Sequence, residues 1–220
     1  GERAQMQFRR SHVHFAKVSA IFISHLHGDH CFGLLGLLST FGMLGRTSRL
    51  KVFAPECYAS LFEQQMNFFM QGMTYEIEFV PVDTTQQKVV YEDHSVTVET
   101  VPLRHRVPCC GYIFREKPTL PHIRRDMIDY YGIPLSQINN IKNGADWTTP
   151  EGDIVPNSRL VEPADAPRSY AYCSDTCYLP DLYERVKDVT VLYHESTYTS
   201  ENEDRAKIYY HSTARQAALV

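Results

Sequence analysis

Apolar residues recur along the chain in runs that are typical of β-strands. Residues 20–24 form one apolar run, and residues 96–104 alternate between apolar and polar side chains as a half-buried strand does. Two further strand-like runs occupy residues 169–174 and 189–193. We therefore predict a strand over each of these four ranges.

Other stretches predict helices and turns. Residues 31–38 are rich in Gly and Leu and predict the start of a helix shortly after the first strand. Residues 64–70 predict a partly buried helix, whose Met and Phe side chains suit a core or a dimer contact. Residues 147–153 predict a turn between two short strands.

The turn between the first strand and the first helix carries four side chains that can bind metal: His25, His27, Asp29 and His30. His25 and His27 are two residues apart on extended backbone and point to the same side, whereas the second pair lies further round the turn. This spacing suits two metal ions, one for each pair. Three imidazoles and a carboxylate favour zinc, or a neighbouring first-row ion, over calcium or magnesium. A histidine-rich surface turn is the alternative, but such turns seldom follow a buried strand.

The other predicted strands also end in residues that can bind metal. His105 follows the strand over 96–104, Asp175 follows the strand over 169–174, and His194 and Glu195 follow the strand over 189–193. Residues at corresponding ends of neighbouring strands converge on one rim of a sheet. His105 and Asp175 are therefore candidates to complete the site. The side chain of His194 should point away from that of Glu195, which favours a core or supporting role.

Residues 25–30 match the HxHxDH signature of the metallo-β-lactamase superfamily. Within it, five further segments resemble the ribonuclease Z (tRNA 3′-processing endonuclease) family, in the family's order and across nearly the whole chain. They are residues 1–5 (the end of the D-x-G-E-G-T-Q strand), 102–112 (the third-histidine segment), 174–176 (G-D-T, with Ser for the first Gly), 194–197 (H-E-A-T) and 211–214 (H-S-T-A).

The resemblance implies a role for each candidate residue. It implies two zinc ions per subunit, with manganese or iron as alternatives. It also implies that Asp29 accepts a proton from the attacking water, and that Glu195 orients His211 so that His211 protonates the departing ribose oxygen. The implied ligands are His25, His27 and His105 for the first metal, Asp29 and His30 for the second, and Asp175 bridging the two.

The fold implied by the resemblance is α/β (α+β): an αββα sandwich of two mixed sheets packed face to face, with helices outside and the metal site at the strand-end rim. We expect a single domain over residues 1–220 that lacks N-terminal strands and the C-terminal strand and helix of the family. One further histidine ligand would follow Val220. Residues 115–160 fall where the family inserts a tRNA-binding arm, but the arm's Gly-Pro-rich character is absent. An ordinary solvated helix and loop is the alternative there.

Charge restricts how an RNA substrate can be held. The formal charge of −4 disfavours RNA binding through the whole surface, so contacts must be local. Residues 1–17 carry four basic residues against one acidic, and residues 115–142 carry five against three. Arg124, Arg125 and Lys142 in the second segment are the candidate substrate contacts.

The cysteine content and the hydropathy of the chain indicate where in the cell the protein is located. The six cysteines are few for 220 residues and irregularly spaced, unlike the disulfide framework of a small secreted protein. Neither a signal-peptide pattern nor a long apolar run is present, so we predict a cytoplasmic location and no membrane partner.

The predicted activity is removal of the 3′ trailer from precursor tRNA. Two metal ions about 3.5–4 Å apart would activate a hydroxide that attacks the phosphodiester and leaves a 3′-hydroxyl on the tRNA. The resemblance also implies a homodimer. One alternative is a phosphodiesterase for small or cyclic phosphodiesters. An alternative of another class is a metal-poor RNA-binding or scaffold protein.

Overall fold

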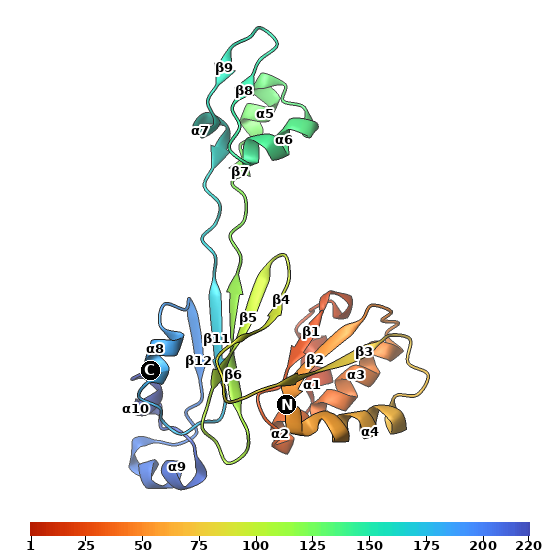
Figure 1. Ribbon diagram of the computed structural model, residues 1–220, viewed down its shortest axis with the longest axis vertical. Coiled ribbons are helices and arrows are strands. Elements are labelled where there is room, and N and C mark those ends of the chain that lie inside the picture. The colour runs from red at the N-terminus through yellow and green to blue at the C-terminus, as the bar shows by residue number, and fades with distance from the viewer. The chain divides into compact units, whose positions relative to one another are not determined.

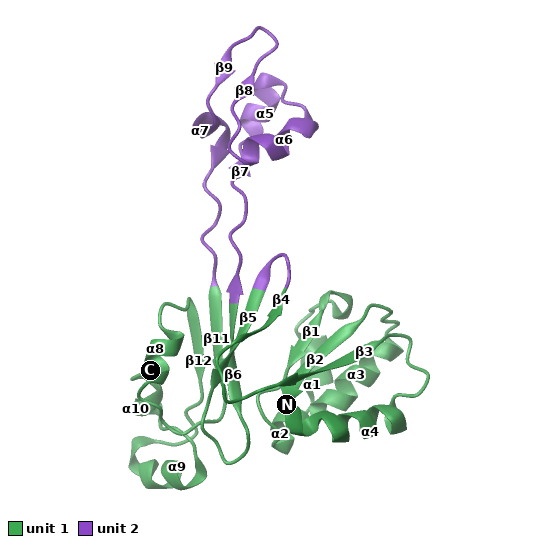
Figure 2. Cartoon of the chain, viewed as in Figure 1, with its two compact units in different colours: residues 1–92, 97–114, 169–220 green, residues 93–96, 115–168 purple.

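The computed structural model describes residues 1–220, which form two compact units. Unit 1 contains residues 1–92, 97–114 and 169–220, and unit 2 contains residues 93–96 and 115–168 (Figure 2). None of the helices is long and apolar enough to cross a membrane.

The first half of unit 1 is built on a three-stranded parallel sheet in the order β1-β2-β3. Parallel neighbours need crossover connections, and helices supply them here. The strands are β1 (Ala20–Phe22), β2 (Leu50–Pro55) and β3 (Ile77–Val82). The helices of this half are α1 (Ala4–Arg10), η1 (Phe15–Lys17), α2 (Gly28–Cys31), α3 (Gly33–Met43), η2 (Glu56–Tyr58) and α4 (Ala59–Phe69).

The second half of unit 1 is a five-stranded sheet in the order β12-β11-β6-β5-β4. It is mixed, because β4 and β5 are antiparallel whereas β11 and β12 are parallel. The strands are β4 (Val89–Glu92), β5 (Val96–Pro102), β6 (Cys110–Glu116), β11 (Ser169–Cys173) and β12 (Val191–His194). The accompanying helices are α8 (Leu182–Val186), η3 (Ser200–Asn202), α9 (Glu203–Tyr209) and α10 (Ala214–Ala217).

The two sheets face each other, with helices on their outer sides (Figure 1). Alternate residues of β2 point to opposite faces. Val52 packs in the cluster that includes α3 and α4, whereas Phe53 stacks on Phe22 and contacts Tyr91 of the second sheet. The hydroxyl of Tyr112 on β6 donates a hydrogen bond across the sandwich, to the carbonyl of the residue that follows β1. The αββα prediction is confirmed.

Most of unit 2 is an insertion between β6 and β11 that folds around a small core of its own, formed by Ile133, Ile141, Val155 and Leu160. The ends of the insertion are joined where Glu116 and Arg168 form a bidentate ion pair. The backbone N–H of Arg168 also donates to the Glu116 carboxylate, and the backbone N–H of Glu116 donates to the carbonyl of Arg168. Its elements are β7 (His122–Ile123), α5 (Arg125–Tyr131), α6 (Leu135–Lys142), β8 (Trp147–Thr148), β9 (Ile154–Val155), α7 (Asn157–Leu160) and β10 (Val161–Glu162).

Most predicted elements are present, with one clear exception. The runs at 20–24, 96–104, 169–174 and 189–193 contain β1, β5, β11 and most of β12, and the turn predicted at 147–153 joins β8 to β9. The prediction for residues 1–5 is wrong: they form a turn and the start of α1, not the end of a strand. Ala, Gln, Met and Arg are good helix formers, and this local preference outweighs the motif likeness.

Candidate metal centre

Four predicted ligands meet in unit 1, although they come from three separate segments. His25 and His27 lie in the loop between β1 and α2, His105 in the loop after β5, and Asp175 just beyond β11. One ligand atom from each of the four lies within 4.8 Å of all the others. His25 is fully buried. This is the convergence on one rim that the strand ends predict.

The local packing at the end of β11 explains how Asp175 reaches this rim. A Cβ atom added to Gly111 of β6 would lie 2.5 Å from the carbonyl oxygen of Tyr172 on β11. Only glycine therefore allows β6 to approach β11 this closely, three residues before the aspartate.

Hydrogen bonds orient the imidazoles so that one nitrogen of each remains for a ligand. Nδ1 of His25 lies 3.1 Å from Oγ of Ser24, whereas its Nε2 is buried without a hydrogen-bond partner. Nδ1 of His105 donates to the carbonyl of Tyr210 at 2.8 Å, which leaves its Nε2 facing Nδ1 of His27 at 3.0 Å. A buried, unpartnered nitrogen beside other imidazoles is what a divalent metal ion would satisfy.

The ionisation of the cluster also suits a metal. Burial, followed by the neighbouring His30, lowers the pKa of His25 to about 3. Burial also lowers the pKa of His105. For Asp175, burial raises the pKa, but the hydrogen bond and charge of His30 outweigh it and bring it to about 2. At neutral pH His25 and His105 are thus neutral imidazoles and Asp175 is a carboxylate, the forms that bind metal.

The second predicted pair lies next to the same carboxylate. Nε2 of His30 is 3.2 Å from Oδ2 of Asp29 and 3.5 Å from Oδ2 of Asp175. The same Asp175 oxygen lies 3.6 Å from Nε2 of His25 and 3.8 Å from Nε2 of His105. Asp175 is therefore placed between the two groups of ligands. The Asp29 side chain is 71% exposed, so it faces solvent at the edge of the site.

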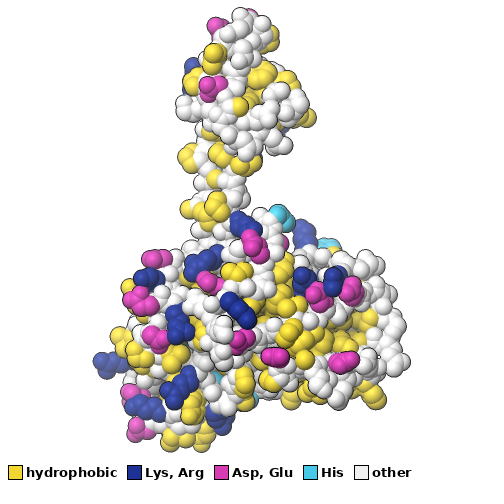
Figure 3. All heavy atoms as spheres, in the orientation of Figure 1, with side chains coloured by type: hydrophobic (Ala, Val, Ile, Leu, Met, Phe, Trp, Pro, Cys, Tyr) yellow, Lys and Arg dark blue, Asp and Glu magenta, His cyan; other side chains and the backbone are white.

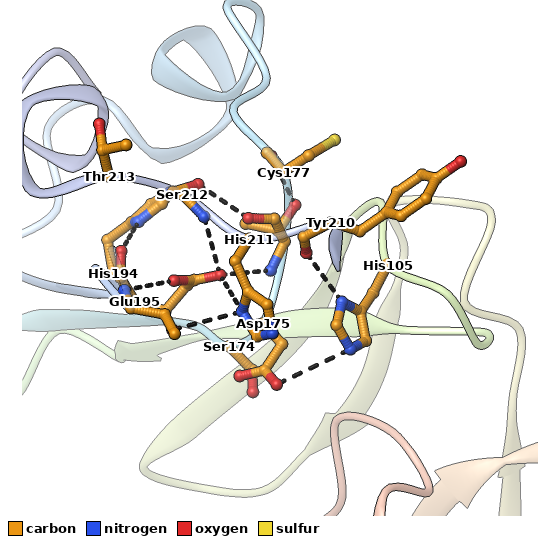
Figure 4. Close-up of polar contacts among 12 residues, drawn as sticks. His105, Ser174, Asp175, Cys177, His194, Glu195, Tyr210, His211, Ser212 and Thr213 are labelled. Carbon is orange, nitrogen blue, oxygen red and sulfur yellow. Dashed lines mark hydrogen bonds and ion pairs between the residues drawn. The ribbon is translucent and has the colours of Figure 1, made fainter. Parts of the chain in front are cut away.

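Glu195 and His211 form a hydrogen-bonded pair beside this cluster (Figure 4). Nδ1 of His211 is 2.8 Å from Oε1 of Glu195. The Glu195 carboxylate also accepts backbone N–H groups from Thr176, Thr197 and Ser212, and it is buried. The His211 and His105 rings are 5.0 Å apart. His211 is thus held next to the candidate metal ligands by a carboxylate that is itself fixed by backbone N–H groups.

The remaining predicted residues take different places. Nδ1 of His194 contacts the carbonyl of Glu195, and its Nε2 is buried without a partner. Arg124, Arg125 and Lys142 all lie in unit 2, outside the metal cluster. Arg124 forms an ion pair with Asp126 at 2.6 Å, and the hydrogen bond to this carboxylate raises the pKa of Arg124.

The sequence did not indicate that the backbone of Tyr210 takes part in this site. Tyr210 adopts a left-handed backbone with φ 57°, which is unusual for a residue with a side chain, and its carbonyl thereby fixes His105. The position follows α9 as its C-terminal cap, where glycine or asparagine is the usual residue. The sequence therefore holds no local signal for this bend.

On the face shown in Figure 3, basic and acidic side chains are interspersed over unit 1, with hydrophobic side chains between them. This mixture agrees with the modest net charge of −4.

The fold and the site together define a member of the β-lactamase superfamily. The family model described as "Beta-lactamase superfamily domain" matches residues 2–123. A ribonuclease Z of Bacteroides fragilis (strain YCH46) is 51% identical over 220 residues, which are 100% of this chain and 72% of that protein. A ribonuclease Z of Phocaeicola vulgatus is 52% identical, over 100% of this chain and 71% of that protein. This chain belongs to the ribonuclease Z family.

A solved structure supports the same fold. The crystal structure of the short form of human tRNase Z matches with a TM-score of 0.64 and 20% identity, and the alignment covers 99% of this chain and 73% of that one. At this identity the likeness concerns the fold alone.

Proposed function

We propose that this protein is a metal-dependent endoribonuclease that removes the 3′ trailer from precursor tRNA. The observation that carries the proposal is the Glu195–His211 pair held next to the His25, His27, His105 and Asp175 cluster. The identity of about half the residues to ribonuclease Z proteins supports it. The reaction is phosphodiester hydrolysis that leaves a 3′-hydroxyl on the tRNA.

Two zinc ions are the proposed cofactors, with manganese or iron as alternatives that suit a similar donor set. His25, His27 and His105 would hold one ion, Asp29 and His30 the other, and Asp175 would contribute to both. The unpartnered Nε2 of buried His25 supports the first position, and the contact of His30 with Asp175 supports the second. Bound ions would supply Lewis acidity that acidifies water and offsets charge on the phosphorane-like transition state.

The protein's own residues would move the protons. Asp29 faces solvent, so its carboxylate can accept a proton from the attacking water. His211 would donate a proton to the departing ribose oxygen. The Glu195 carboxylate accepts from Nδ1 of His211, which sets the tautomer and stabilises the imidazolium form. Because three backbone N–H groups also hold this carboxylate, the imidazole keeps its orientation throughout turnover.

We further propose that residues 115–160 contribute tRNA contacts through Arg124, Arg125 and Lys142. Of these, Arg124 also forms an ion pair with Asp126. The protein would act as a cytoplasmic homodimer. We propose that residues 1–220 act as one catalytic domain, in which unit 2 is the altered tRNA-binding insertion.

The test is cleavage of a precursor tRNA with a 3′ trailer, with the product end mapped and its 3′-hydroxyl verified by ligation. The expected result is one cut just after the discriminator nucleotide, abolished by chelation and restored by zinc. Cleavage should weaken steeply as salt rises, because RNA binding displaces counterions. A phosphodiesterase for small or cyclic esters would leave the precursor intact and respond weakly to salt. A metal-poor RNA-binding protein would bind the precursor without cutting it.

A further inference from the structure

Two arginine–tyrosine stacks lie on either side of His105 in sequence, at the edge of the metal cluster. The guanidinium carbon of Arg104 is 5.8 Å from the centre of the Tyr210 ring, and that of Arg106 is 5.6 Å from the centre of the Tyr209 ring. The arginines come from the loop after β5, and the tyrosines from the end of α9. The proposed catalytic steps use none of these four side chains.

The first stack borders a cavity. Arg104, Tyr210 and His211 are among the residues that line a cavity of about 320 Å³, together with the ion pair between Lys207 and Glu203. This volume lies at the lower end of the range of about 300–1,000 Å³ for ligand pockets, which suits a single nucleobase. The tyrosine and arginine of the first stack therefore line the same cavity as the proposed acid, His211.

No carboxylate pairs with either arginine, in contrast to several other arginines of the protein. Arg124, Arg168 and Arg185 each have a carboxylate oxygen within 2.8 Å. Arg104 and Arg106 are exposed and form no ion pair; each lies over a tyrosine ring instead. Stacking holds a guanidinium in place while leaving its N–H groups for phosphate.

We propose that this cavity is the subsite for the nucleotide whose ribose oxygen leaves during cleavage, which is the last nucleotide of the mature tRNA. The assignment rests on the proposed function, because His211 lines the cavity and would protonate that oxygen. The base stacks on Tyr210, and Arg104 and Arg106 contact the flanking phosphates. Stacking accepts every base, so the subsite positions this nucleotide without selecting its identity.

The test removes the base of the last tRNA nucleotide and the ring of Tyr210, first separately and then together. Precursor tRNAs are made with an ordinary or an abasic residue at the last tRNA position, and kcat/KM is measured for the unmodified protein and for Tyr210→Asn. Asparagine tolerates the left-handed backbone, so the carbonyl that fixes His105 stays in place. Tyr210→Phe keeps the ring. Tyr183→Asn, on α8 and outside the cavity, is the matched control.

The abasic residue should lower kcat/KM of the unmodified protein, of Tyr210→Phe and of Tyr183→Asn by roughly 5- to 150-fold, the range of one lost stack. The abasic residue should change kcat/KM of Tyr210→Asn by less than about twofold, because the ring on which the base stacks has already been removed. Arg104→Gln should weaken precursor cleavage, because the guanidinium that contacts a flanking phosphate is removed. Metal content should be unchanged in every variant.

Two failures have different meanings. If the unmodified protein leaves the precursor uncut, both the proposed function and the subsite are overturned. If it cuts the precursor but the abasic residue has the same effect on Tyr210→Asn as on the unmodified protein, the subsite alone is overturned.

Discussion

Replacing Glu195 or His211 tests the proton-donating pair most directly. In Glu195→Gln the amide oxygen can still accept at the Oε1 position, where Thr176, Ser212 and His211 donate. The amide nitrogen then faces the N–H of Thr197, which now donates to Oε2 at 2.9 Å. One charge-assisted hydrogen bond is lost and a buried donor is left unpaired, which should cost about 3 kcal/mol of the free energy of unfolding.

Both substitutions should also lower the rate of cleavage. A positioned general acid contributes about 10²- to 10⁴-fold to the rate, so His211→Ala should slow single-turnover cleavage by that factor. In Glu195→Gln the ring keeps its place but loses the carboxylate that stabilises its charged form, so cleavage should also slow. If the two residues act as a unit, the double variant should be little slower than His211→Ala alone.

The assay is single-turnover cleavage of precursor tRNA below the melting temperature of the least stable variant. Glu184→Gln serves as the matched control, because its carboxylate pairs with Lys187 on the exposed face of α8. A p-nitrophenyl phosphodiester is measured in parallel, since its leaving group departs without a proton and should hide the loss of His211. Additive losses would refute the pairing. An equal loss on both substrates would refute the role of His211 as acid.

The other predictions concern the metal ligands and the core. Asp29→Ala at saturating zinc should lower precursor cleavage at least about 10²-fold, and normal cleavage would exclude its role as base. Elemental analysis should give about two zinc ions per chain and a lower content in His105→Ala; fewer than one in the unmodified protein would refute the two-metal mechanism. Burial raises the pKa of Tyr58 and of Tyr75 to about 12. The folded protein therefore keeps a proton on each of these tyrosines that the unfolded chain releases near pH 10, and each should make stability in urea denaturation fall by up to about 1.4 kcal/mol per pH unit between pH 10 and 12. Tyr75→Phe should make that slope shallower by up to about 1.4 kcal/mol per pH unit, and an unchanged slope would contradict the assignment.

The sequence predicted the parts of the site that depend on local spacing. The pairs within residues 25–30 could be separated because a strand has a period of two, and His105 and Asp175 could be found because they follow recognisable strands. The interactions that join distant segments could not be predicted in this way. Tyr210 reaches His105 across 105 positions of the chain through a backbone conformation that its side chain disfavours. Likewise, nothing in the local sequence of Arg104 indicates which ring it will cover.

The stretch from residue 117 to residue 167 leaves the five-stranded sheet from β6 and returns to it at β11, which are neighbours in that sheet. Its two ends are joined by the Glu116–Arg168 pair before the rest of unit 2 begins. Insertions and deletions inside this stretch therefore need not change the strand order that places His105 and Asp175. The tRNA contacts proposed for this stretch can therefore change in evolution, or be exchanged by an engineer, without altering the strand order that holds the candidate metal centre.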